Sequence, residues 1–263
     1  MIDHTNERCA PSVAAQRLWS ERYPAAKVLF CGGSVIRGEG LASSDLDVVV
    51  LFERIPNAWR ESFMFLGWPV EVFAHDPETL AYFFDEDRSA GRPSLAQMIS
   101  EAIAVPEGTA WESAGRACAR ATIAETPPRP PPDAIERARY ALTDLLDDFR
   151  DDRPRADLVA IACQLYPEVS HFILKSHGRW LGSGKTLPRL VRSAAPELSA
   201  QLEQGFETFF RTGERAPAIA AAVRALEQFG GEVFDGFRAD APPEWRRTGA
   251  DVPLDFVAVD VSR

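Results

Sequence analysis

Long apolar runs and paired cysteines are scarce in this chain of 263 residues. No apolar stretch approaches the roughly 20 residues that a helix needs to cross a bilayer, and the polar N-terminus is unlike a secretory leader. The four cysteines (Cys9, Cys31, Cys118 and Cys163) are widely separated, with no Cys-x-x-Cys pair. This spacing excludes a zinc-binding or disulfide framework. We therefore expect a protein without membrane contact in a bacterial cytoplasm, where thiols stay reduced.

Positive charge is also in deficit, since the formal net charge is −10. A protein that grips a long nucleic acid presents a basic surface, so nucleic acid is not an expected partner. Lysine is rare: Lys27, Lys175 and Lys185 stand against 26 arginines. Each of the three lysines can therefore be considered separately as a candidate binding residue. Nothing in the sequence indicates an oligomeric state.

Proline, in contrast, is concentrated at one place. Five prolines in seven residues at 126–132 favour a stiff, extended linker. The pattern before it is mixed, and beyond it apolar residues recur at three- and four-residue intervals, as in helices. We expect an α+β protein: a small mixed β-sheet domain with flanking helices over residues 1–125, then an all-α helical bundle over 133–238. A tail over 239–263 ends with an apolar run whose structure the sequence does not define.

The most informative stretch joins two apolar runs, at 28–31 and 48–52, which predict buried strands. Asp45 and Asp47 stand at the start of the second strand and, two residues apart, project to the same face. Two carboxylates beside an apolar core repel each other and lose hydration. A divalent cation would offset that cost, and Mg²⁺ commonly takes one or two carboxylates plus substrate phosphates.

The turn between these strands offers a site for the phosphates themselves. Gly32 and Gly33 allow a close approach of the backbone to an anion. Ser34 can cap a short following helix, whose N-terminal amides would face the same anion.

A third carboxylate follows in a further apolar strand, predicted at 70–73 after a helix at 58–66. Glu71 lies within that strand, where an acid is costly unless it is satisfied. The alternative is a glutamate on an edge strand that faces water. His75, at the end of the strand, could lie near the site, although a lone histidine there is more often structural.

Together, Gly33-Ser34, ten residues, and Asp45-Leu46-Asp47 give the pattern G-S-x10-D-x-D. This resembles the signature of the DNA polymerase β-like nucleotidyltransferase superfamily, and the two-domain plan resembles its bacterial, aminoglycoside-type members. The alternative is a glycine turn followed by a strand with a solvated acidic start.

The resemblance implies a Mg²⁺-dependent (or Mn²⁺-dependent) transfer of a nucleoside monophosphate from an NTP, expected to be ATP, to a hydroxyl of a small molecule. Asp45 and Asp47 would then hold the metal as catalytic residues. Glu71 would serve as catalytic base or extra metal ligand, and Gly33 and Ser34 would bind phosphates. Pyrophosphate would be released.

A glycine-rich stretch at 177–186 ends in Lys185-Thr186. A P-loop requires glycine where Arg179 stands, so that alternative fails. The resemblance implies instead that the helical domain supplies a basic residue to the triphosphate. Lys185 is the first candidate for this nucleotide-binding role, and Lys175 is the weaker one.

The acceptor is not defined by any motif. An aminoglycoside is one hypothesis, because a polycation suits an acidic cleft. A protein, a tRNA-like end and a different metabolite are the alternatives. The main alternative in function is a nucleotide-binding or regulatory protein without turnover, of the kind found in toxin–antitoxin pairs. Turnover of an NTP with an acceptor separates the two.

Overall fold

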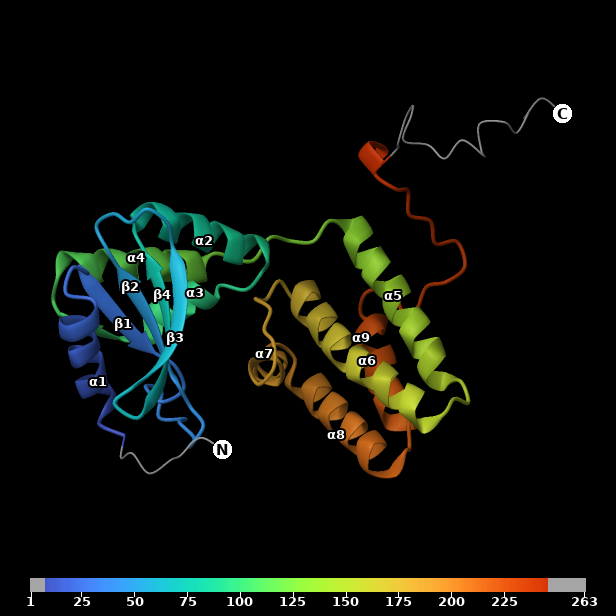
Figure 1. Cartoon of the computed structure of the whole chain (residues 1–263). Helices are drawn as coiled ribbons and strands as arrows, with labels where there is room; N and C mark the ends of the chain where they lie inside the picture. Colours follow the sequence, from blue (N-terminus) through green and yellow to red (C-terminus); the bar gives the residue numbers. More distant parts are fainter. Residues whose placement is uncertain (1–7, 246–263) are drawn as a thin grey trace, which may run out of the picture.

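A computed structural model describes residues 8–245 of the chain (Figure 1). In Figure 1 these residues form a half built on a β-sheet and a half built of helices alone. Most of the predicted tail, residues 246–263 with their apolar run, lies outside the described residues. No helix within 8–245 is both long enough and apolar enough to cross a membrane.

The sheet is mixed, with the strand order β3-β4-β2-β1-β5. The strands are β1 (Val28–Gly32), β2 (Leu46–Leu51), β3 (Trp59–Phe65), β4 (Trp68–His75) and β5 (Ile103–Val105). β2 and β4 are parallel, and the other neighbouring pairs are antiparallel. The predicted α+β class and the strands predicted at 28–31, 48–52 and 70–73 are confirmed.

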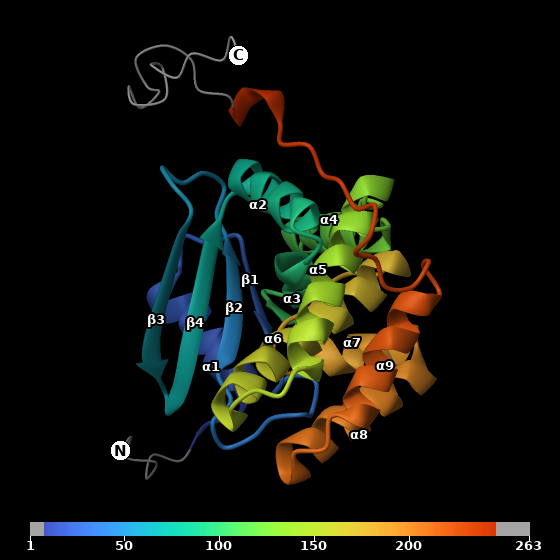
Figure 2. The same ribbon diagram turned by 90° about the vertical axis from the view of Figure 1, so that its right-hand side faces the viewer.

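Helices cover both faces of this sheet, as the view in Figure 2 shows. On one face lies α1 (Pro11–Arg17), which continues as a π-helical turn to Arg22. The other face carries α2 (Pro77–Ser89), α3 (Ser94–Glu101) and α4 (Ala110–Ala124). Because β1 and β2 are covered on both sides, their sequences are almost continuously apolar.

The helical half begins after residues 126–131, which form neither helix nor strand. Its helices are α5 (Pro132–Arg150), α6 (Arg155–Ser176), α7 (Thr186–Ala194), α8 (Pro196–Thr212) and α9 (Ala216–Glu227). They enclose a hydrophobic core of their own, separate from the two cores that flank the sheet. The region boundaries given above, at residues 125, 132 and 238, stay predictions.

The predicted helix at 58–66 is wrong, because this segment forms β3. From Arg60 onward, exposed and half-buried positions alternate as in a strand, although the polar residues stand together at 60–62 rather than alternating with apolar ones. Leu66 and Gly67 both have positive φ (49° and 80°). That geometry makes the two-residue turn that joins β3 to β4, since such turns match the twist of the strands.

The predicted short helix after Ser34 is also wrong. Residues 34–38 form successive turns, closed by a hydrogen bond from the Glu39 amide to the Ser34 carbonyl (2.9 Å). Glycine is among the poorest helix formers, and Gly38 here has a positive φ of 75°. Ser34 therefore has no helix to cap.

The contact between α8 and α9 yields a prediction about stability. A Cβ atom added at Gly205 would lie 2.7 Å from the Ala218 Cα on α9. Because backbone cannot yield as a side chain can, we expect Gly205→Ala to destabilise the protein by about 1–3 kcal/mol. Thermal unfolding followed by circular dichroism measures this.

Gln204→Ala is the matched control, since Gln204 is the exposed neighbour on the same helix. Its effect should stay within about 0.5 kcal/mol. Equal melting temperatures for the two variants would show that the α8–α9 contact is looser than described.

Candidate functional site

The register of three strands brings the predicted acidic residues to one corner of the sheet. β2 and β4 run parallel with Asp47 paired to Glu71. β1 runs antiparallel to β2 with Gly32 paired to Asp47. Asp45 directly precedes β2. The first glycine turn and the three carboxylates therefore meet where β2 and β4 begin.

Asp47 is the most perturbed of the three carboxylates. Burial raises its pKa above the ordinary 3.8, and the negative charges of Asp45 and Glu71 raise it further. Lys185 and Arg37 act in the opposite direction without cancelling the rise. The folded protein therefore disfavours the ionised form of Asp47.

Gly33 packs directly against this carboxylate. A Cβ atom at position 33 would lie 2.9 Å from the Asp47 Oδ2 atom, and φ is +97°. Only glycine adopts that conformation without strain. The turn therefore places backbone, rather than a side chain, beside the carboxylate.

Ser34 stabilises the loop between β1 and β2, and its phosphate-binding role stays a prediction. Its side chain is buried, and its Oγ atom lies 3.0 Å from the Ser44 Oγ atom. Ser44 also accepts a hydrogen bond from the Leu41 amide (2.9 Å). The two serines thus tie together both ends of the loop between β1 and β2. Gly33 borders the interdomain cavity described next, and Ser34 is not among the residues that line it.

A cleft of about 590 Å³ lies between this corner and the helical half. Asp47 and Gly33 line it from the sheet, and the loop before α7 lines it from the other side with Lys185. Hydrogen bonds to two backbone carbonyls join the halves beside it. The Leu181 amide donates to the Gly91 carbonyl (2.7 Å), and the Trp180 indole donates to the Ile123 carbonyl (3.2 Å).

Lys185 therefore lines the same cleft as Asp47, whereas Lys27 and Lys175 lie elsewhere. Lys175 lines cavities within the helical half, and Lys27 pairs with Glu53 (2.8 Å). The segment before the glycine-rich loop is the helix α6 and not a strand, which also excludes a P-loop.

Three further cations line the cleft that the sequence did not single out: Arg37, Arg92 and Arg189. Arg37 pairs with Glu101 (2.9 Å) and Arg189 with Glu39 (2.8 Å). Arg92 makes no ion pair within residues 8–245. The lining holds four basic and two acidic side chains, so the acidic cleft expected for an aminoglycoside is not present here. These arginines come from three distant segments, and no spacing in the sequence connects them.

Glu71 forms an ion pair with Arg60 from β3, through its Oε1 atom. The Arg60 guanidinium also lies over the Phe73 ring, 5.0 Å from its centroid. β4 is flanked by β3 and β2, so Glu71 does not lie on an edge strand.

The carboxylates do not form a closed metal cage. Within the described part of the chain, no three His, Cys, Asp or Glu side chains are grouped closely enough to hold a metal ion by themselves. Their oxygens are the hard ligands that Mg²⁺ prefers, and Mg²⁺ usually draws its other ligands from water and substrate phosphates. Asp45 and Asp47 fit such a shared site.

No protein-family model and no curated protein sequence matches this chain. Among solved structures, it is similar to a nucleotidyltransferase-like protein from Exiguobacterium sibiricum 255-15, at 12% sequence identity and a TM-score of 0.42. The match covers 83% of this chain and 74% of that one. A likeness at this level does not decide the function.

The charge on Asp47 predicts a stability effect in metal-free buffer. A carboxylate whose pKa is raised on folding opposes folding above that pKa, and the penalty vanishes below the ordinary value. We therefore expect Asp47→Asn to raise the melting temperature at pH 7 in the presence of EDTA. The gain should shrink as the pH falls toward 4.

Glu53→Gln is the control, since Lys27 lowers the pKa of Glu53 through a hydrogen bond and its charge. That variant should not gain stability at pH 7. A melting temperature for Asp47→Asn at or below that of the wild type would contradict the account of the corner.

Proposed function

We propose that the protein is a nucleotidyltransferase that moves a nucleoside monophosphate from an NTP to a hydroxyl of a small molecule. The observation that carries the proposal is the pairing of Asp47 with Glu71, beside the Gly33 turn and across a cleft from Lys185. These four groups come from four separate segments. Gly33, Asp47 and Lys185 line the cleft, and Glu71 adjoins it through its pairing with Asp47, which supports a shared role.

The donor would lie in the cleft with its phosphates toward the Gly33 turn. Lys185, Arg92 and the two paired arginines supply positive charge along the same cavity. A triphosphate needs such charge, because phosphate oxygens bind best to charged donors. The basic lining thus favours an NTP over a polycation as the molecule in this cleft.

Asp45 and Asp47 would hold a divalent cation, Mg²⁺ or Mn²⁺. When bound, that cation would neutralise the phosphates and stabilise both the attacking and the leaving oxygens of an in-line displacement. It would also offset the burial and the like charges that together raise the pKa of Asp47.

Glu71 would take the proton of the acceptor hydroxyl. Arg60 binds its Oε1 atom, which leaves Oε2 to receive the proton. The hydroxyl oxygen then forms a bond to the α-phosphorus. The bond from that phosphorus to the β-phosphate bridging oxygen breaks, and pyrophosphate leaves. Lys185 would stabilise the charge that develops on this leaving group.

A binding assay tests the donor site. Differential scanning fluorimetry with ATP, GTP, CTP and UTP, each with and without Mg²⁺, should give a Mg²⁺-dependent rise in melting temperature for at least one NTP. Saturating ligand at 100 times its Kd adds about 2.7 kcal/mol. We expect Lys185→Gln to weaken the affinity about tenfold, or about 1.4 kcal/mol.

Lys175→Gln is the matched control, because it removes the same charge from outside the cleft. Its NTP affinity should equal that of the wild type. Equal losses in the two lysine variants would point to a general charge effect and would remove Lys185 from the site.

Turnover separates the enzyme from a nucleotide-binding regulator. We expect Glu71→Gln to keep NTP binding and to lower kcat by about 100-fold to 10,000-fold, the range of general base catalysis. Release of pyrophosphate in the presence of an acceptor measures it. Pyrophosphate release at the wild-type rate in this variant would exclude Glu71 as the base. Binding without any turnover of the wild type across acceptor classes would favour the regulatory alternative.

A further inference from the structure

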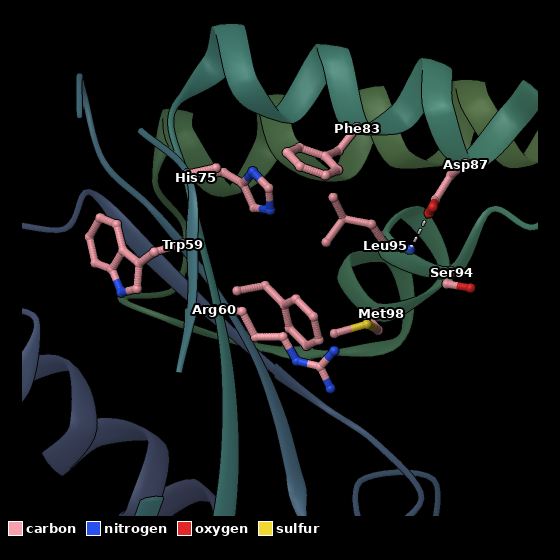
Figure 3. A pocket seen from close by; sticks show the side chains of 10 residues that line it. Trp59, Arg60, His75, Phe83, Asp87, Ser94, Leu95 and Met98 are labelled. Atoms are coloured by element: carbon pink, nitrogen blue, oxygen red, sulfur yellow. Dashed lines mark hydrogen bonds between the residues drawn. The ribbon is translucent and has the colours of Figure 1, made fainter. Parts of the chain in front are cut away.

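A second cavity, of about 380 Å³, lies beside the candidate site, between the outer strands and α2 and α3 (Figure 3). Its walls are the side chains of Phe73 and His75 from β4, Phe83 from α2, and Leu95 and Met98 from α3. Trp59 also borders it, but its ring points away from this group in Figure 3. The cavity is therefore mainly apolar and aromatic, as small-molecule pockets commonly are.

The cavity adjoins the proposed base. Glu71, Phe73 and His75 alternate along β4 and so project to the same face of the sheet. Arg60 both borders the cavity and pairs with Glu71. Ser94 and Met98 line this cavity and the interdomain cleft alike, so the two spaces share a wall.

Within residues 8–245, His75 is the polar side chain of this cavity that is buried without a complete set of hydrogen-bond partners. Its side chain is 5% exposed, and its Nδ1 atom is buried with no hydrogen-bond partner among the described residues. The imidazole points into the cavity, with Phe83 at its edge (5.2 Å between ring centroids) (Figure 3). Buried polar atoms in native proteins almost always have a partner. The other ring nitrogen, Nε2, points into the cavity in Figure 3, and a polar group on a bound molecule would contact this atom.

The charges around the cavity limit what can bind. Asp87 is its one acidic side chain, and the Asp87 Oδ2 atom already accepts from the Leu95 amide (2.9 Å). Arg60 lies at the opposite side in Figure 3 and repels cations. A polycationic aminoglycoside would therefore find no free carboxylate here. An uncharged aromatic ring fits the walls better.

We propose that this cavity binds the body of the acceptor, and that the acceptor is an uncharged, ring-bearing alcohol. Its reacting hydroxyl would lie at Glu71, and a second polar group would bond to His75. Four residues of strand, about 13 Å, separate these two positions, which suits a molecule of two fused rings with polar groups at opposite ends. This inference rests on the proposed nucleotidyl transfer.

Two probes test the cavity on the full chain: 6-(hydroxymethyl)-2-naphthol, and 2-naphthalenemethanol, which lacks the second hydroxyl. Titration calorimetry should give saturable binding of both, with the naphthol tighter. We expect Phe83→Ala to weaken both about tenfold, as when one aromatic contact is lost. His75→Phe should abolish the advantage of the naphthol. Phe210→Ala is the matched control, since Phe210 is an exposed aromatic residue on α8, outside the cavity. It should change neither affinity.

The same samples receive the NTP panel, so that two failures can be told apart. If an NTP raises the melting temperature but neither probe binds, this inference is overturned and the proposed function stands. The same holds if the probes bind equally well to the wild type and to Phe83→Ala. Probe binding without any NTP shift overturns the proposed function and the acceptor role with it. With NTP and Mg²⁺, mass spectrometry should detect the nucleoside monophosphate ester of the naphthol. An ester of kanamycin in place of the naphthol ester would overturn the assigned acceptor class.

Discussion

The charge on Asp47 is the constraint around which the site is arranged. Its carboxylate is half-buried at the start of β2, with Asp45 and Glu71 adding negative charge and Lys185 and Arg37 opposing it. Folding alone gains nothing from such a grouping, because burial and like charges both disfavour the ionised form. The grouping is explained if the site binds a metal cation together with a polyanionic substrate. Strained or unfavourable local chemistry is commonly retained where function requires it.

Two neighbouring spaces then have complementary characters. Basic side chains outnumber acidic ones in the interdomain cleft, and the cavity under α2 is lined mainly by apolar and aromatic side chains. Glu71 pairs with Arg60, which borders the cavity, and with Asp47 on β2, which borders the cleft. The wall of Ser94 and Met98 is common to both spaces. A charged donor and an apolar acceptor would thus meet at one carboxylate. The division depends on the mixed sheet, because the parallel pairing of β2 with β4 sets Glu71 beside Asp47.

Much of this arrangement follows from local sequence, and some of it does not. The apolar runs of β1, β2 and β4 predict strands because both faces of these strands are buried. The sequence does not reveal β3, because the turn after this strand depends on positive φ at Leu66, a residue that rarely adopts it. Without β3, neither Arg60 nor the cavity could be foreseen. Arg92 lines the cleft only because the helical half packs against the sheet half there. No local sequence pattern predicts that packing.

The central claim is that Asp45 and Asp47 share a divalent cation with the triphosphate of an NTP. The most direct measurement is a crystal structure of the full chain grown with Mn²⁺ and a non-hydrolysable NTP, with data collected for anomalous scattering. The account predicts an anomalous peak within coordination distance of oxygens of both aspartates, and a triphosphate that reaches Lys185. A well-ordered nucleotide elsewhere, or a cleft with nucleotide but no peak at these aspartates, would contradict it.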